Sequence, residues 1–273
     1  MFKRSFASKD RAGKATAKST TKSKRSFRDH NKQKLLQQKL DSPPVGSTLT
    51  SPIITLVIGR EQRLFAAHED VLSLSPFFKA ACRGQFLEAN TRRVDLPDEE
   101  PEAFSCVLEY LYKGDYYPRL LHDKRRNSWV LEDSQDQING GRGCVEPTTD
   151  IFGVDGPVLR DTVIYCYADK YGLEELKRLA LRKQGLQSGI ECATVLRSAR
   201  YAYDQTPDTD SRLRAHYLAL IIRSRKTFKR SGTMQMEMEI GGKMFFDLFV
   251  AMCNHMDDIV DIRHVHTSLS PLC

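Results

Sequence analysis

The stretch LFAAHEDVLSLSPFFKAACRGQFLEA, residues 64–89, carries the side chains whose types and spacing could do chemistry. His68, Glu69 and Asp70 are consecutive, and Cys82 follows them on the same apolar stretch. A histidine next to carboxylates could act as a general base with an orienting group, and a thiol could act as a nucleophile. Consecutive side chains point in different directions on a strand or a helix, so these three are not expected to converge on one substrate. The order of residues instead favours a turn from a strand into a helix, with Cys82 as a small buried apolar residue further along.

A second group of possible metal ligands lies further along the sequence, at His255, Asp257, Asp258, Asp261, His264 and His266. Their spacing matches no zinc-binding pattern. The glycines of NGGRG, residues 139–143, follow no predicted strand, so they are not expected to form a phosphate-binding loop. No GxSxG nucleophile motif occurs in the sequence. We therefore expect no enzymatic activity, no cofactor and no metal ion.

The composition limits the class of protein. The 273 residues are 40% hydrophobic, which is enough for a folded core. No run of about 18 uninterrupted apolar residues occurs, so we expect no membrane span. The N-terminal residues are polar and contain no apolar signal segment, and the seven cysteines are scattered without CxxC pairs. These features favour reduced thiols in a protein of the nucleus, the cytoplasm or both.

The positive charge is concentrated in the N-terminal part of the sequence. Residues 1–41 contain 13 Lys and Arg against 3 Asp, a formal charge of +10, whereas the remainder carries −3. This segment is rich in Ser, Thr and Lys and poor in apolar residues, so residues 1–46 are predicted to be a disordered basic arm. The arm is compatible with a solvated tail, a nuclear import signal at KSKRSFR, contacts to nucleic acid phosphates, or a mitochondrial presequence.

From residue 47 onward, segments with the period of a strand alternate with segments that have the period of a helix. IITLVIG and RLFAAH, separated by a turn, predict a β-hairpin over residues 53–68. Two short helices over 69–83 and a short strand at RRVDLP follow. Asp98 is then expected to cap a helix that has Glu99, Glu100 and Pro101 in its first turn and ends at Gly114. Residues 118–157 are polar, glycine-rich and aperiodic, and they are predicted to be a disordered insertion.

Helical patterns resume after this segment. Residues 157–184 predict two helices with a break at Gly172, and residues 186–273 predict a C-terminal helical extension that begins with a helical pair over 189–224. MQMEMEI, residues 234–240, alternates like a strand although methionine and glutamate favour helices, so both assignments stay open. GGKMFFDLFVAMCNHM is predicted to be a helix.

Three motifs in this order resemble the BTB/POZ domain: FAAHEDVLSLSPFFKAA, VDLPDEEPEAFSCVLEYLYKGDY and ADKYGLEELKRLA. The similarity is greatest to fungal members, which carry an insertion after the LYKGDY-type segment, and it covers residues 50–117 and 157–184. It implies an α+β fold over residues 47–185, in which a small sheet with a hairpin packs on a cluster of α-helices. Members of this family are not enzymes; they dimerise and recruit partners. The resemblance also implies that the histidine of the AH dipeptide, here His68, is a packing residue.

The resemblance also implies a site for a protein partner. BTB domains that recruit a cullin ubiquitin-ligase scaffold often present an apolar residue, any residue and then Glu just after the PFFKA-type helix. Here that position reads Phe86-Leu87-Glu88. An exposed aromatic side chain beside a carboxylate suits an anchor in a pocket with a polar contact at its rim. Phe86, Tyr112 and Tyr116 are interface aromatics or, alternatively, cover the edge of the core.

These features lead to one main hypothesis and one alternative. The main hypothesis is a protein-interaction module that forms a homodimer and acts as an adaptor, recruiting partners to a cullin-based ubiquitin ligase through Phe86, Leu87, Glu88 and Tyr112. The alternative is a nuclear regulator of transcription or chromatin whose residues 1–41 bind nucleic acid with an affinity that falls steeply with salt. No kelch, MATH or zinc-finger motif, which would select a substrate, is found in the sequence.

Overall fold

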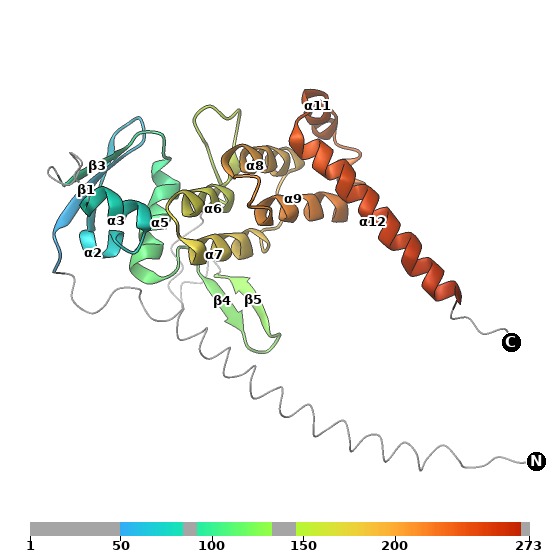
Figure 1. Cartoon of the computed structure of the whole chain (residues 1–273), viewed down its shortest axis with the longest axis horizontal. Helices are drawn as coiled ribbons and strands as arrows, with labels where there is room; N and C mark the ends of the chain where they lie inside the picture. The colour runs from blue at the N-terminus through green and yellow to red at the C-terminus, as the bar shows by residue number, and fades with distance from the viewer. Residues whose placement is uncertain (1–49, 84–91, 133–145, 269–273) are drawn as a thin grey trace, which may run out of the picture. The chain divides into compact units, whose positions relative to one another are not determined.

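The structure is a computed structural model that describes residues 50–83, 92–132 and 146–268, the last nine of them as backbone only. These residues belong to one unit, which spans Val45–Cys273. Short strands in three sheets combine with α-helices, as Figure 1 shows. The α+β class predicted from the sequence is confirmed.

The largest sheet has three strands in the order β2–β1–β3 (Figure 1). Strand β1 (Ile53–Ile58) pairs antiparallel with β2 (Arg63–His68), which confirms the predicted hairpin, and parallel with β3 (Arg93–Leu96). The turn after β1 requires Gly59, because its φ is +74° and a Cβ there would lie 3.1 Å from the Glu99 carbonyl oxygen. The hairpin therefore lies directly against the loop that precedes helix α5.

The sheet packs against helices α2 (Glu69–Leu72), α3 (Pro76–Arg83) and α5 (Pro101–Lys113) (Figure 1). Burial alternates at the start of β1, where Ile54 is buried and Thr55 is exposed. α5 begins with a proline, which has no N–H to leave unsatisfied at a helix start, and ends at a glycine in the left-handed conformation.

An aromatic cluster joins this core to the helices that follow. The ring of Phe104 on α5 makes edge-on contacts with three other rings, at centroid distances of 5.8 Å to Phe65, 6.2 Å to Phe78 and 6.1 Å to Tyr171. Phe78 and Phe104 are fully buried. Ser75, just before α3, donates a hydrogen bond from its Oγ to the Tyr171 carbonyl oxygen at 2.7 Å. These contacts hold α3 on the core.

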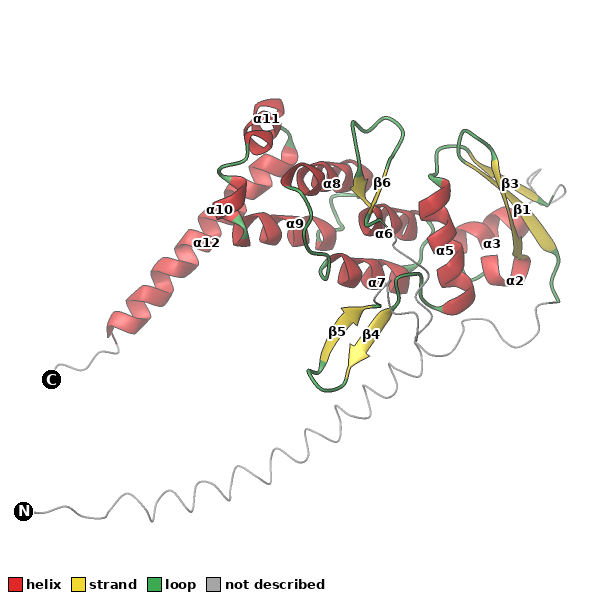
Figure 2. Cartoon of the chain, turned by 180° about the vertical axis from the view of Figure 1, so that it is seen from behind, coloured by secondary structure: helices red, strands yellow, loops and turns green. Residues whose placement is uncertain are grey.

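Helix α6 (Arg160–Lys170) lies in the middle of the helical part, because α5, α7 (Glu174–Gln184) and α8 (Cys192–Gln205) all pack on it (Figure 2). Its first nine residues are all buried, so this stretch has no solvent-facing stripe. Buried polar side chains on such a helix need partners. Thr162, for example, donates a hydrogen bond from its Oγ1 to Gln184 at 2.8 Å.

The C-terminal part is helical, as predicted. α9 (Arg212–Arg223) packs on α8, which confirms the helical pair, and α10 (Arg225–Phe228) follows. The segment MQMEMEI belongs to helix α11 (Gly232–Ile240), so the helical assignment is the correct one. α12 (Lys243–Ser268) packs on α8 and α9 and buries Met244 (Figure 2). Within the described ranges, no helix combines the length and the apolar character needed to cross a membrane.

Part of segment 118–157 is ordered, which corrects its prediction as a disordered insertion. Strands β4 (Leu120–Asp123) and β5 (Ser128–Leu131) form an antiparallel hairpin (Figure 1). Further on, β6 (Thr148–Thr149) pairs with β7 (Val158–Leu159). The segment therefore contains regular structure on both sides of the residues that the structure leaves undescribed.

Side-chain pairs explain why the β4–β5 hairpin forms. Arg119 donates to both carboxylate oxygens of the buried Glu132, at 2.8 and 2.7 Å, and closes the base of the hairpin. The rings of His122 and Trp129 face each other across the strands with centroids 4.9 Å apart. The two strands are only four residues long and their apolar residues do not alternate with polar ones, which is why the sequence predicts an irregular segment here. Residues 133–145 lie outside the described residues, and for them disorder stays a prediction.

A buried ammonium group fastens the chain between α5 and β4 to helix α7. Lys183 is fully buried, forms an ion pair with Asp115 and donates hydrogen bonds to the carbonyl oxygens of Tyr116 and Pro118 at 2.5 and 2.8 Å. Its Nζ also lies 3.5 Å from the centroid of the Tyr116 ring. Burial lowers the pKa of Lys183, and the Asp115 carboxylate opposes that lowering.

Candidate protein-interaction site

Of the four predicted partner-binding residues, Tyr112 is the one that the structure describes. Phe86, Leu87 and Glu88 lie outside the described residues, since α3 ends at Arg83 and the description resumes at residue 92. Tyr112 on α5 is half-buried and packs against the core. The assignment of these residues to a partner-binding site stays a prediction.

The hydroxyl of Tyr112 is used within the fold. Its oxygen accepts a hydrogen bond from the backbone N–H of His68 at 2.9 Å and lies 2.8 Å from His68 Nδ1. The two rings meet edge-on with centroids 6.0 Å apart. β2 ends at His68 and α2 begins at Glu69, which confirms the predicted strand-to-helix turn and the packing role of His68. Any contact between Tyr112 and a partner is therefore expected to use its ring.

The other residues considered for chemistry do not form a site with His68. Asp70 is exposed on α2, and Cys82 is half-buried and packed against the core, which is less buried than the sequence predicts. No group of three or more His, Cys, Asp or Glu side chains that could hold a metal ion occurs in the described part of the chain, which includes residues 255–258. Of the second group of possible metal ligands, the structure does not describe the side chains of Asp261, His264 and His266.

The start of α3 is positioned by a close contact with the turn between α6 and α7. Gly172 in this turn has a φ of +69°, and a Cβ there would lie 3.2 Å from the ring of Pro76. The position thus requires glycine both for its backbone conformation and for the close approach. The sequence predicts a helix break at Gly172, but its contact with α3 is visible only in the structure.

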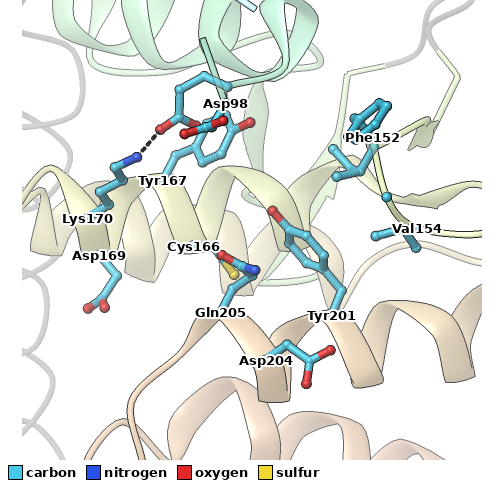
Figure 3. Close-up of a pocket in the computed structure, with 13 residues that line it drawn as sticks. Asp98, Phe152, Val154, Cys166, Tyr167, Asp169, Lys170, Tyr201, Asp204 and Gln205 are labelled. Carbon is cyan, nitrogen blue, oxygen red and sulfur yellow. Dashed lines mark hydrogen bonds and ion pairs between the residues drawn. The ribbon is translucent and has the colours of Figure 1, made fainter. Parts of the chain in front are cut away.

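The described residues also form an open pocket of about 610 Å³, drawn in Figure 3. Four segments line it: Asp98 and Glu99 before α5, residues 151–154 between β6 and β7, Cys166, Tyr167, Asp169 and Lys170 on α6, and Tyr201, Asp204 and Gln205 on α8. Tyr112, the predicted site residue that the structure describes, does not line this pocket. Sequence reasoning missed it because no local pattern links segments that lie so far apart in the chain.

Two ion pairs neutralise part of the charge around this pocket. The Nζ of Lys170 lies 2.5 Å from the Glu99 carboxylate, the pair marked by a dashed line in Figure 3. The Nζ of Lys177 lies 2.5 Å from the Asp169 carboxylate. Burial raises the pKa of Tyr167, and the nearby Glu99 carboxylate raises it further, so its phenol is neutral at physiological pH.

Comparison with known families identifies the class of the sheet-containing part. Residues 54–124 match the family model described as the BTB/POZ domain. The match begins in β1 and ends just after β4, so it includes the three-stranded sheet and helices α2, α3 and α5. The chain therefore contains a BTB/POZ domain, which is a protein–protein interaction module and not a catalytic domain.

The family match confirms the predicted resemblance over residues 54–124, while the similarity to fungal members stays a prediction. Comparison with curated proteins yields no match. The general class of function, protein binding, thus rests on the BTB/POZ domain itself.

Proposed function

We propose that the chain is an adaptor that recruits protein partners to a cullin-based ubiquitin ligase through Phe86, Leu87, Glu88 and Tyr112. The observation that carries this proposal is the BTB/POZ domain, together with the apolar-x-Glu sequence soon after α3. The hydrogen bond from Ser75 Oγ to the Tyr171 carbonyl oxygen holds the start of α3 on the core, and the apolar-x-Glu sequence follows soon after the end of this helix. The helical pair α8–α9 supports the proposal, because cullin adaptors tend to follow the BTB fold with such a pair.

The test compares cullin binding by the full chain and by the double variant Phe86→Ala/Glu88→Ala. Binding is expected to weaken at least about 30-fold, because a buried aromatic anchor contributes about 2 kcal/mol or more to an interface. The measurement is recovery in a pull-down, followed by titration with a purified cullin. The matched control is Leu64→Ala/Glu61→Ala, which removes an exposed apolar side chain and a carboxylate from the β1–β2 hairpin. Equal affinity of the double variant and the unmodified chain would exclude the cullin version of the proposal.

We further propose that the chain forms a homodimer. Large apolar side chains are exposed along α12, with exposed fractions of 67% at Phe246, 66% at Phe249 and 55% at Met256. Together with Cys253 they recur at intervals of three and four residues, which is the spacing of a seam between two helices. A patch of this kind in a soluble protein is typical of an interaction surface.

Light scattering of the full chain is expected to give twice the single-chain mass of 31.1 kDa. The variant Phe246→Asp/Phe249→Asp is expected to shift the mass toward that of one chain, because it places charges in the seam. A single-chain mass for the unmodified protein at about 100 µM would contradict the proposal, since an interface of useful affinity is occupied at that concentration.

A further inference from the structure

The hydroxyl of Tyr201 on α8 is a polar group of this pocket that the fold does not use. The residue is 8% exposed, yet within the described part of the chain its hydroxyl makes no hydrogen bond. Figure 3 shows this hydroxyl pointing into the pocket. Burial raises the pKa of Tyr201, as do Cys166 and Glu99, so the hydroxyl keeps its proton and can both donate and accept. Because the ring is buried and the hydroxyl itself reaches the pocket, the hydroxyl can hydrogen-bond to a polar group of a ligand there.

Two carboxylates line the same pocket without a cation partner among the described residues. Asp98 lies in the loop before α5 and Asp204 lies on α8, and both are exposed (Figure 3). Lys170 is the one basic residue of the lining, and its ammonium group is paired with Glu99. The lining therefore carries a surplus of negative charge, which attracts a cationic group and repels an anion.

The loop between β6 and β7 adds an apolar wall to these polar groups. Val154 packs against the core, and Phe152 is 72% exposed at the rim. The Phe152 ring already makes one cation–π contact, because the central carbon of the Arg60 guanidinium lies 3.1 Å from the ring centroid. Arg60 itself lines the neighbouring groove and not this pocket. An apolar wall beside carboxylates suits a side chain with an aliphatic stem and a cationic end.

We propose that this pocket binds a lysine or arginine side chain of a partner polypeptide. The cationic end would meet Asp98 or Asp204 and the hydroxyl of Tyr201, and the aliphatic stem would lie against Phe152 and Val154. A volume of about 610 Å³ accommodates one long side chain with the adjoining backbone. This second contact is independent of the segment after α3, and it would select the polypeptide that the protein recruits.

The experiment uses the full chain and fluorescent heptapeptide pools that differ only in a fixed central residue. The central residue is arginine, lysine, citrulline or norleucine, and binding is measured by anisotropy. Arginine and lysine pools are expected to bind at least about 10-fold more tightly than their uncharged counterparts, because a charge-assisted contact is lost in the latter. Cullin titrations on the same samples are expected to be unaffected by the peptides, which separates this proposal from that of the cullin site.

Three variants locate the contact. Tyr201→Phe removes one oxygen atom and is expected to weaken binding of the arginine pool about 3- to 10-fold. Asp98→Asn/Asp204→Asn is expected to remove most of the preference for arginine over citrulline. Asp257→Asn, an exposed carboxylate on α12, is the control and is expected to bind like the unmodified chain. Thermal unfolding of each variant shows that it is folded.

Several results would overturn the proposal. Equal binding of the arginine and citrulline pools would show that the pocket does not recognise the charge. No binding of any pool at about 1 mM would show that it has no useful affinity for such side chains. Unchanged affinity in both pocket variants would place the contact elsewhere, and equally strong competition by argininamide would assign the pocket to a small cation in place of a polypeptide.

Discussion

Replacing Lys183 with methionine is expected to lower the free energy of unfolding by about 3–5 kcal/mol, because it leaves Asp115 as a partly buried carboxylate without its cation. The carbonyl oxygens of Tyr116 and Pro118 lose a donor in the same step. The methionine side chain fills most of the volume, so the loss reports on the polar contacts more than on packing. Urea unfolding followed by circular dichroism measures it.

The matched control is Lys113→Met, in the exposed ion pair that Lys113 forms with Glu109 one helical turn earlier at 2.8 Å. That pair contributes only about 0.3–0.5 kcal/mol. The double variant Lys183→Met/Asp115→Asn is expected to regain part of the loss, because the uncompensated charge is then gone. Equal stability of the Lys183→Met and Lys113→Met proteins would contradict the role assigned to the buried ammonium group.

Replacing Phe104 with alanine is expected to cost about 3–5 kcal/mol, because a buried aromatic ring leaves a cavity that the surrounding core fills only in part. Phe104 has no exposed surface and lies between the rings of Phe65, Phe78 and Tyr171. Phe78 belongs to α3, so the cavity would lie next to the helix that the predicted cullin-binding segment follows. Thermal and urea unfolding measure the loss.

Phe152→Ala is the control for the same change of residue type at an exposed position. Phe152 is 72% exposed and contacts the Arg60 guanidinium, so its loss is expected to cost no more than about 1 kcal/mol. If both variants lost the same stability, the aromatic cluster would not be the centre of the core. Cullin binding by Phe104→Ala is expected to weaken only to the extent that the protein unfolds.

The sequence predicts the elements of the BTB/POZ part well because each element has a local signal. The β-branched run and the turn at Gly59 indicate the hairpin of β1 and β2, and the three-to-four-residue spacing of apolar side chains indicates α5. The resemblance added the order in which these elements pack. The partner-binding segment Phe86-Leu87-Glu88 comes from that resemblance alone and lies outside the described residues.

Local pattern fails where polar groups are buried. The charged end of α7, which contains Lys183, has the composition of an exposed helix face, yet Lys183 is fully buried. The β4–β5 hairpin is held by the pair Arg119–Glu132 and by the ring contact between His122 and Trp129. Neither contact appears in the sequence as an alternation of apolar and polar residues. α6 is buried on all sides over nine residues because α5, α7 and α8 pack on it. The sequence of one helix does not show which other helices will pack on it.

The sequence by itself thus determined the class of protein, the positions of most helices and of the first three strands, and the segment predicted to meet a cullin. Only the tertiary structure decided which charged side chains are buried and where a pocket forms. The physical reason is that periodicity and helix-end signals act over a few neighbouring residues, whereas the pocket brings Asp98, Phe152, Cys166 and Tyr201 together from four separate segments. That convergence brings together the hydroxyl, the carboxylates and the aromatic wall on which the proposed binding of a cationic side chain rests.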